Sequence, residues 1–306
     1  MIKYVLMVLA GAASFGILSS FVKIAYSQGY TPAEISFIQA LMGAGALWSF
    51  FLASKKQNAK AKDILWLLFA GASIGITTFL YYLSVKYIPA SVAIVLLMQF
   101  TWLGILIEWI LFKKRPMVLE LVITVIILAG TILASGLTGQ KEFNLSPKGV
   151  GIVLASSLVY AIYIVANSRV GKNVYWQNKS AWIMTGSAAA IFLVNFHTVA
   201  FENHIGPHLL KWGLFLAFFG TVLPQILFAV GMPKVGASTS GLLMTVELPV
   251  AVVTAHLILK EEVNLVQFFG IVIMLSAIIG MNVIKQRGKA AELVIKGTEG
   301  DLKTAE

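Results

Sequence analysis

The chain has 306 residues, of which 58% are hydrophobic and 12% charged, and its formal net charge is +10. A soluble domain has about 25% charged residues, so this composition excludes an ordinary soluble globule and predicts an all-α polytopic membrane protein. The basic excess does not indicate a nucleic-acid partner, because the lysines and arginines stand between apolar runs. The chain contains no cysteine, which excludes disulfides and thiol chemistry.

Ten apolar segments are long enough to cross a bilayer as helices, which takes about 20 residues each. The first continues as far as Ala25 behind a single Lys3, which favours a retained helix over a cleaved signal peptide. In chain order the predicted transmembrane segments are 4–27, 32–54, 64–86, 90–112, 117–138, 149–168, 180–200, 210–232, 236–259 and 264–284.

Basic residues alternate between the two sides of these segments. With the N-terminus inside, 17 lysines and arginines lie in the inner segments and 5 in the outer ones. This bias follows the positive-inside rule and predicts a multi-pass protein of the cell (plasma) membrane, of the bacterial inner-membrane kind. Both termini are expected in the cytoplasm, with residues 286–306 as a polar cytoplasmic tail.

The second half of the chain resembles the first at an offset of 147 residues. Residues 89–116 align without a gap on 236–263, and Lys113 falls opposite Lys260. The alternative is that any two apolar helices look alike, but the shared spacing continues upstream. We therefore predict a first five-helix repeat over 1–140 and a second over 141–285. Because five is odd, the second repeat is inverted, as is typical of secondary transporters.

This layout resembles the drug/metabolite transporter (DMT) superfamily, and in particular the EamA-type transporters. The resemblance covers residues 1–285 and includes Pro249 followed thirteen residues later by Glu262. Many relatives carry a Glu-Pro pair in the ninth helix, whereas a leucine separates Glu247 from Pro249 here, and the fourth helix lacks their central proline. The resemblance implies export or exchange of small metabolites through a central cavity lined by helices one, three, four, six, eight and nine.

Glu247 is the main candidate for a functional residue. Between Gly236 and Leu259 it is the one residue certain to be charged, and Pro249 removes an N–H that would have bonded the carbonyl of Thr245. A charged acid at the bilayer centre costs about 2.5 kcal/mol or more. We therefore expect Glu247 in the cavity as a substrate-binding or proton-coupling group. The alternative is a protonated or hydrogen-bonded acid that packs against another helix.

Further candidates are polar or aromatic residues near the middle of predicted helices, or neighbours of Glu247 at helical spacing. Phe100 is the residue of the first repeat that aligns with Glu247. We therefore predict a cavity with one apolar and one polar side, suited to a ligand with one apolar and one polar or cationic end. For each candidate the alternative is a packing or interhelical hydrogen-bonding role. They are Gln99, Phe100, Trp102, Tyr82, Tyr160, Tyr163, Asn167, Gln225, Met244 and Ser240.

Three charges lie near predicted helix ends. Lys23 and Glu34 flank the first outer turn, where an ion pair could close an external gate, although two separate interfacial charges would also fit. Glu108 lies five residues before Lys113 and is expected to reach the inner membrane surface.

The sequence favours a secondary transporter of a small organic metabolite (amino acid-, nucleoside- or drug-like), working as an exporter or exchanger by alternating access, with a proton as the candidate coupling ion. A nucleotide-sugar or phosphorylated-metabolite carrier is a rival, but it would want basic residues in the cavity. An intramembrane enzyme is another alternative, but it needs several ionisable groups at one depth, and only Glu247 is clearly central. A membrane interaction subunit without transport is a third class. We expect no cofactor or metal. The partners would be the solute and the bilayer, and a homodimer is left open.

Overall fold

The computed structural model describes residues 2–54, 59–88, 90–134, 146–202, 206–260, 263–281 and 283–284. Each predicted segment is helical over most of its described length, while the predicted tail 286–306 lies outside the described residues. The elements are α1 (Ile2–Ser27), α2 (Pro32–Ala53), α3 (Ala61–Ser84), α4 (Ala90–Leu97), α5 (Phe100–Phe112), α6 (Val118–Ala134), α7 (Pro147–Arg169), α8 (Trp176–Val194), α9 (Phe196–Phe201), α10 (Pro207–Ala217), the π-helix η2 (Phe218–Val222), α11 (Leu223–Val235), α12 (Ala237–Met244), α13 (Glu247–Leu259) and an apolar helix Leu265–Met281.

The molecule is an all-α polytopic membrane protein. Seven helices in the described part of the chain are long and apolar enough to cross a bilayer, and α6 and the helix Leu265–Met281 are shorter apolar helices. Large apolar side chains such as Leu52, Phe69 and Leu111 are exposed on the outside of the bundle. A surface of this kind suits contact with lipid rather than water.

The helix starts follow from local chemistry. Pro32, Pro147 and Pro207 stand in the first turns of α2, α7 and α10, where a missing N–H is harmless. Thr31 and Glu34 form a capping box before α2, each side chain accepting a hydrogen bond from the backbone N–H of the other residue.

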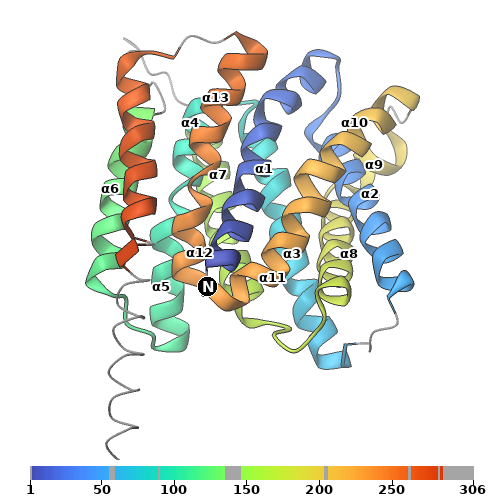
Figure 1. Cartoon of the computed structure of the whole chain (residues 1–306). Helices are drawn as coiled ribbons and strands as arrows, with labels where there is room; N and C mark the ends of the chain where they lie inside the picture. The colour runs from blue at the N-terminus through green and yellow to red at the C-terminus, as the bar shows by residue number, and fades with distance from the viewer. Residues whose placement is uncertain are drawn as a thin grey trace, which may run out of the picture.

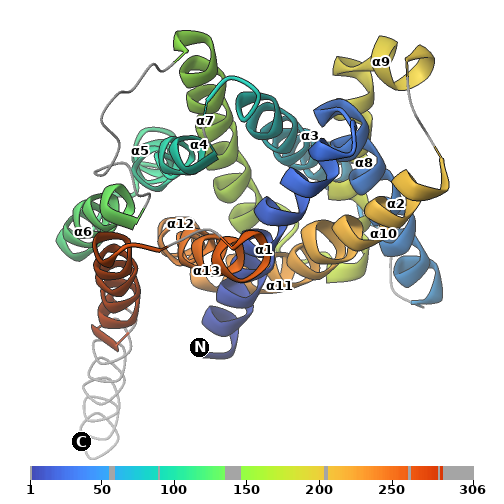
Figure 2. The ribbon, with the colours of Figure 1, turned by 90° about the horizontal axis from the view of Figure 1, so that it is seen from above.

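Figures 1 and 2 show a bundle with a dense centre and two flanks. The helix α1 begins, and the helix Leu265–Met281 ends, at the same end of the bundle, which we call the N-end (Figure 1). Seen from above, α6 and Leu265–Met281 form one flank, α2, α8 and α10 the other, and α1, α3, α7, α12 and α13 lie between them (Figure 2). On the first flank a Cβ added to Gly130 would lie 2.7 Å from Met274 Cγ, so glycine lets these two helices pack closely.

Two helices are broken near their middle, and the breaks obey the 147-residue offset. The elements α4 and α5 have 8 and 13 residues, as do α12 and α13. Lys113 and Lys260 end α5 and α13 in the left-handed conformation, and they are the non-glycine residues with positive φ in the described part of the chain. The two broken helices run in opposite directions (Figure 1), as an inverted repeat requires.

At each break, backbone hydrogen bonds span three residues instead of four. The N–H of Gln99 bonds the carbonyl of Leu96 at 3.2 Å, and that of Val246 bonds Leu243 at 3.3 Å. In the first half, Ser157 on α7 donates to the carbonyl of Leu97 at 2.9 Å. A hydroxyl from a neighbouring helix thus satisfies a carbonyl beside the break, which lipid could not do.

Small residues set the closest helix crossing, between α3 and α8. A Cβ on Gly71 would overlap the carbonyl of Ile183, and one on Gly186 would overlap the carbonyl of Leu68. Small residues allow such backbone approach, which stabilises helix pairs in membranes. Near this crossing the structure differs from the predicted segment 180–200, because α8 begins at Trp176. Lys179, expected in a loop, lies in its first turn and is 1% exposed.

Candidate functional site

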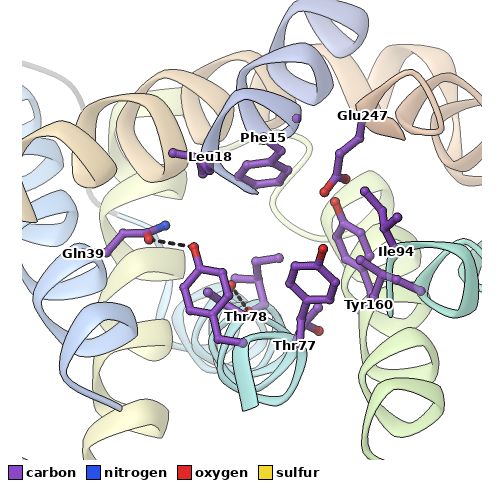
Figure 3. Close-up of a pocket in the computed structure, with 13 residues that line it drawn as sticks. Phe15, Leu18, Gln39, Thr77, Thr78, Ile94, Tyr160 and Glu247 are labelled. Carbon is purple, nitrogen blue, oxygen red and sulfur yellow. Dashed lines mark hydrogen bonds between the residues drawn. The ribbon is translucent and has the colours of Figure 1, made fainter. Parts of the chain in front are cut away.

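A cavity lies beside the two helix breaks. Its volume is about 60 Å³, and its walls come from α1, α2, α3, α4, α7 and α13 (Figure 3). A smaller space of about 20 Å³ shares Phe15 and Gln39 with it and continues toward α8, η2 and α11. Volumes of this size hold a few water molecules, whereas sites for small molecules measure about 300–1,000 Å³. The cavity must therefore widen to hold a solute.

The cavity lies away from the N-end of the bundle. Its lining includes Gln39 in the first half of α2 and Thr77, Thr78, Tyr81 and Tyr82 in the last third of α3. These two parts of the chain lie toward the end at which α2 begins and α3 ends. The half of the bundle nearer the N-end is filled by packed side chains of α7, α11 and α12, including Tyr163, Met232 and Met244.

Glu247 is the first residue of α13 and points into the cavity (Figure 3). The residue is 8% exposed, and its Oε2 has no hydrogen-bond partner among the described residues. Gly16 lets α1 approach this point, because a Cβ there would lie 2.5 Å from the carbonyl oxygen of Glu247. The chain thus holds an acid inside the bundle with one oxygen unsatisfied, which is costly unless a ligand, water or proton compensates it.

Aromatic rings line the cavity that holds the acid. Phe15, Tyr81, Tyr82 and Tyr160 all line the cavity, and Figure 3 shows the Tyr160 hydroxyl pointing toward the Glu247 carboxyl. The faces of such rings attract ammonium groups. Among the described residues that line either space, none is a lysine or arginine. The site is therefore suited to a cationic or neutral group rather than to a phosphate.

Gln39 marks the opposite side of the cavity from Glu247 (Figure 3). Its Oε1 accepts a hydrogen bond from the Tyr82 hydroxyl at 3.2 Å, and its Nε2 donates to the carbonyl of Gly220 at 3.2 Å. Gly220 belongs to the π-helix η2, whose widened turn presents this carbonyl to a neighbour. The cavity thus has an acidic side and an amide side.

Three predicted residues meet below the cavity, toward the N-end. The Tyr163 hydroxyl donates to Oε1 of Gln225 at 2.9 Å and accepts from Nδ2 of Asn167 at 3.1 Å. Gln225 lines the smaller space. Its Nε2 and the Oδ1 of Asn167 are buried without a partner among the described residues. The side chains of Tyr163 and Asn167 on α7 therefore point into the bundle.

Phe100, Met244 and Ser240 are fully buried but line neither space. The Phe100 ring packs edge-on against Tyr160, with ring centroids 4.7 Å apart, so it supports the cavity wall from behind. The Oγ of Ser240 has no hydrogen-bond partner in the described part of the chain. Contact of these three with a solute stays a prediction.

Gln99 and Trp102 are placed on the outer surface of the bundle. Trp102 is 41% exposed, and its Nε1 donates to Oε1 of Gln99 at 2.8 Å. Both line a shallow hollow with Leu96, Leu154 and Leu158. The structure therefore does not bring them to the cavity, because they lie on a different face of the broken helix from Ile94 and Leu97, which line it.

The predicted external gate stays a prediction. The carboxylate of Glu34 accepts from the N–H and hydroxyl of Thr31 at 2.8 and 2.7 Å, and is 3% exposed. It therefore has a capping role whether or not it also pairs with Lys23, which is half-buried.

Sequence reasoning missed several lining residues, chiefly Phe15, Thr77, Thr78 and Tyr81. A signal was present in the run TTFLYY (77–82), which places two threonines and two tyrosines at helical spacing in an otherwise apolar helix. Tyr82 alone was predicted from it.

A bundle of apolar helices, with two antiparallel broken helices beside a largely apolar cavity that holds a few polar groups, is the architecture of a membrane transporter. The model of the EamA-like transporter family matches residues 2–136 and again residues 147–283. The chain therefore belongs to the EamA-like transporter family, and the double match agrees with its internal repeat.

Named relatives are transporters as well. The chain is 27% identical over 264 residues to the threonine/homoserine exporter RhtA of Escherichia coli (strain K12), covering 85% of each chain. It is 25% identical over 272 residues to the uncharacterized transporter YcbK of Bacillus subtilis (strain 168), covering 86% of this chain and 87% of YcbK. A protein of known crystal structure shares the fold with a TM-score of 0.74 at 15% identity, covering 93% of this chain and 98% of the other.

Proposed function

We propose that this chain exports a small amino acid or a related amine by alternating access, with Glu247 as the group that binds the ammonium of the solute or a coupling proton. The observation that carries the proposal is the Oε2 of Glu247, which is buried in a cavity without a hydrogen-bond partner among the described residues. Alternating use of this oxygen by solute and proton would couple their movements.

The substrate class is supported by two independent features. The aromatic rings and the acid favour an ammonium group, and a curated relative is named as a threonine/homoserine exporter. The rival, a nucleotide-sugar or phosphorylated-metabolite carrier, would need cationic groups in the lining, and the described lining has no lysine or arginine. We also propose transport rather than an intramembrane reaction, because Glu247 is the one carboxyl among the described residues that line the cavity.

The proposed arrangement has two repeats, residues 1–140 and 141–285, with a cytoplasmic tail over 286–306 and the N-end facing the cytoplasm. The basic bias of the predicted inner segments supports this orientation. The cavity would then lie toward the outside of a plasma membrane, and the half of the bundle filled by packed side chains would lie toward the cytoplasm.

The test is counterflow in liposomes that hold purified protein, with labelled threonine, homoserine, putrescine and UDP-glucose offered in turn. We expect uptake of at least one of the amines and none of UDP-glucose. Hydrogen bonds to charged groups contribute about 1.5–3 kcal/mol. Glu247→Gln should therefore raise the half-saturating solute concentration about 10- to 100-fold.

Glu120→Gln is the matched control, because it neutralises another buried acid whose carboxylate bonds the N–H of Met117 at the start of α6. Its counterflow should equal that of the wild type. An imposed pH gradient should accelerate amine transport in the wild type but not in Glu247→Gln. Undiminished, equally pH-sensitive counterflow in a folded Glu247→Gln protein would contradict the role of Glu247, and preferred uptake of UDP-glucose would favour the rival.

A further inference from the structure

A second buried acid, Glu108, ties three helices together at the N-end. Glu108 is 2% exposed. Its Oε2 accepts hydrogen bonds from Lys114 Nζ at 3.0 Å and from the Ser238 hydroxyl at 2.7 Å, and the backbone N–H of Ser238 lies 3.3 Å away. Its other oxygen accepts from the guanidinium of Arg169. The acid expected at the membrane surface is therefore enclosed and fully partnered.

These contacts bridge the two matched stretches of the chain. Glu108 and Lys114 belong to the first stretch, on α5 and just after it, whereas Arg169 ends α7 and Ser238 begins α12 in the second. Arg169 also stacks over the Phe112 ring at 3.8 Å. The end of α5 and the start of α12 lie together at the N-end (Figure 1).

The region between these contacts and the cavity is packed but polar. Asn167, Gln225 and Ser240 are each at most 4% exposed, and Oδ1, Nε2 and Oγ, respectively, lack hydrogen-bond partners in the described part of the chain. Buried polar atoms are rarely left unsatisfied. These three residues belong to α7, α11 and α12, the helices whose packed side chains fill the half of the bundle nearer the N-end.

The position that matches Glu108 in the second repeat does not hold an acid. At the offset of 147 residues, Glu108 corresponds to Ala255 on α13, whereas the neighbouring Lys113 corresponds to Lys260. The backbone conformations of the two broken helices match, but their side chains differ at this position. An alanine side chain cannot accept the hydrogen bonds that Glu108 accepts, so Ala255 does not reproduce this contact.

We propose that Glu108 acts as a latch, by which we mean that its bonds to Arg169 and Ser238 hold the N-end of the transport route closed. Opening at this end would separate α5 from α12 and release the carboxylate to water and Lys114, which is itself half exposed. This inference rests on the proposed transport function, because it assigns the closure that alternating access requires. We therefore expect the protein at rest to have its N-end closed.

The test uses the natural absence of cysteine from the chain. Ser240→Cys introduces a nearly isosteric thiol in the half nearer the N-end, and its rate of modification by a membrane-impermeant maleimide is measured in inside-out and right-side-out vesicles. Adding Glu108→Gln should raise this rate about tenfold, the change in equilibrium expected from losing a charge-assisted hydrogen bond. The increase should occur from the N-end side alone.

Two further variants make the result specific. Glu120→Gln neutralises a buried acid at the start of α6 and should leave the labelling rate unchanged. Ser238→Ala removes one hydrogen bond while keeping the ion pairs, so it should raise the rate less than Glu108→Gln does. It also serves as the test if Glu108→Gln fails to fold.

An unchanged rate in a folded Glu108→Gln protein overturns the latch, as does an equal rise in Glu120→Gln, which would indicate general loosening. If Glu108→Gln does not fold, an unchanged rate in Ser238→Ala overturns it. Labelling needs no solute. A failure to find any transported amine would therefore count against the proposed function and would leave the labelling result readable.

Discussion

Replacing Gly186 with alanine is expected to force α3 and α8 apart. The added Cβ would overlap the carbonyl oxygen of Leu68 and lie 2.8 Å from its Cα and 2.9 Å from its carbonyl carbon. Carbon atoms in contact prefer about 3.5–4.0 Å, so the backbone of α3 must move by roughly 1 Å. No side-chain rotation relieves the overlap, because the obstructing atoms belong to the backbone.

The cost can be bounded from two opposing effects. Overpacking of this kind typically costs about 1–3 kcal/mol, whereas alanine is about 1 kcal/mol better than glycine inside a helix. Gly45→Ala isolates the second effect, because Gly45 is an exposed residue of α2 with nothing within 4 Å of a Cβ. The free energies of unfolding of the two variants should therefore differ by about 1–3 kcal/mol.

Thermal unfolding in detergent measures this difference, with the loss of monodisperse protein as the readout. Gly186→Ala should have a Tm lower than Gly45→Ala by roughly 2–10 °C. Equal Tm values for the two variants would refute the argument, since they would show that α3 and α8 do not rely on backbone contact at this glycine.

Two other substitutions probe the site and its supports. Tyr163→Phe removes the hydroxyl shared by Gln225 and Asn167, and leaving buried amides short of partners should cost about 1–3 kcal/mol, seen as a lower Tm; an unchanged Tm would mean that water replaces the hydroxyl. Gly236→Ala should cost about 1–3 kcal/mol, because φ there is +92°, whereas Gly241→Ala, with open space at its Cβ, should melt like the wild type or higher; equal losses in both would contradict the backbone argument.

The repeat was the most informative feature of the sequence. Aligning Lys113 with Lys260 predicted paired helices, and the structure gives them equal lengths and the same left-handed cap. The break at Gln99 was not predicted, because it has no glycine or proline signal. The hydroxyl of Ser157 on α7 satisfies a carbonyl beside it, and such a tertiary contact between distant residues is not visible in a local pattern.

The candidate site was predictable where the residue type alone was unusual. Glu247 stood out because an acid in an apolar helix is costly, and it does line the cavity. Trp102 is equally unusual but faces outward, because it lies on a different face of its helix from Leu97, which lines the cavity. The sequence places Glu108 at the membrane surface, whereas the structure buries it. Its burial could not be predicted, because its partners Arg169 and Ser238 are more than 60 residues away in the chain and no helix periodicity connects them.

The two helix breaks have matching backbones but carry different side chains at the position that follows each break. Glu247 and Phe100 both begin the second half of a broken helix. The acid faces the cavity, while the phenyl ring packs behind Tyr160, which itself lines the cavity. The break also forms without proline in the first half, so a break of this kind does not require a proline. Because the paired backbones match, the choice of side chain at this one position places the ionisable group on a single repeat, and a solute bound there would meet the two halves differently.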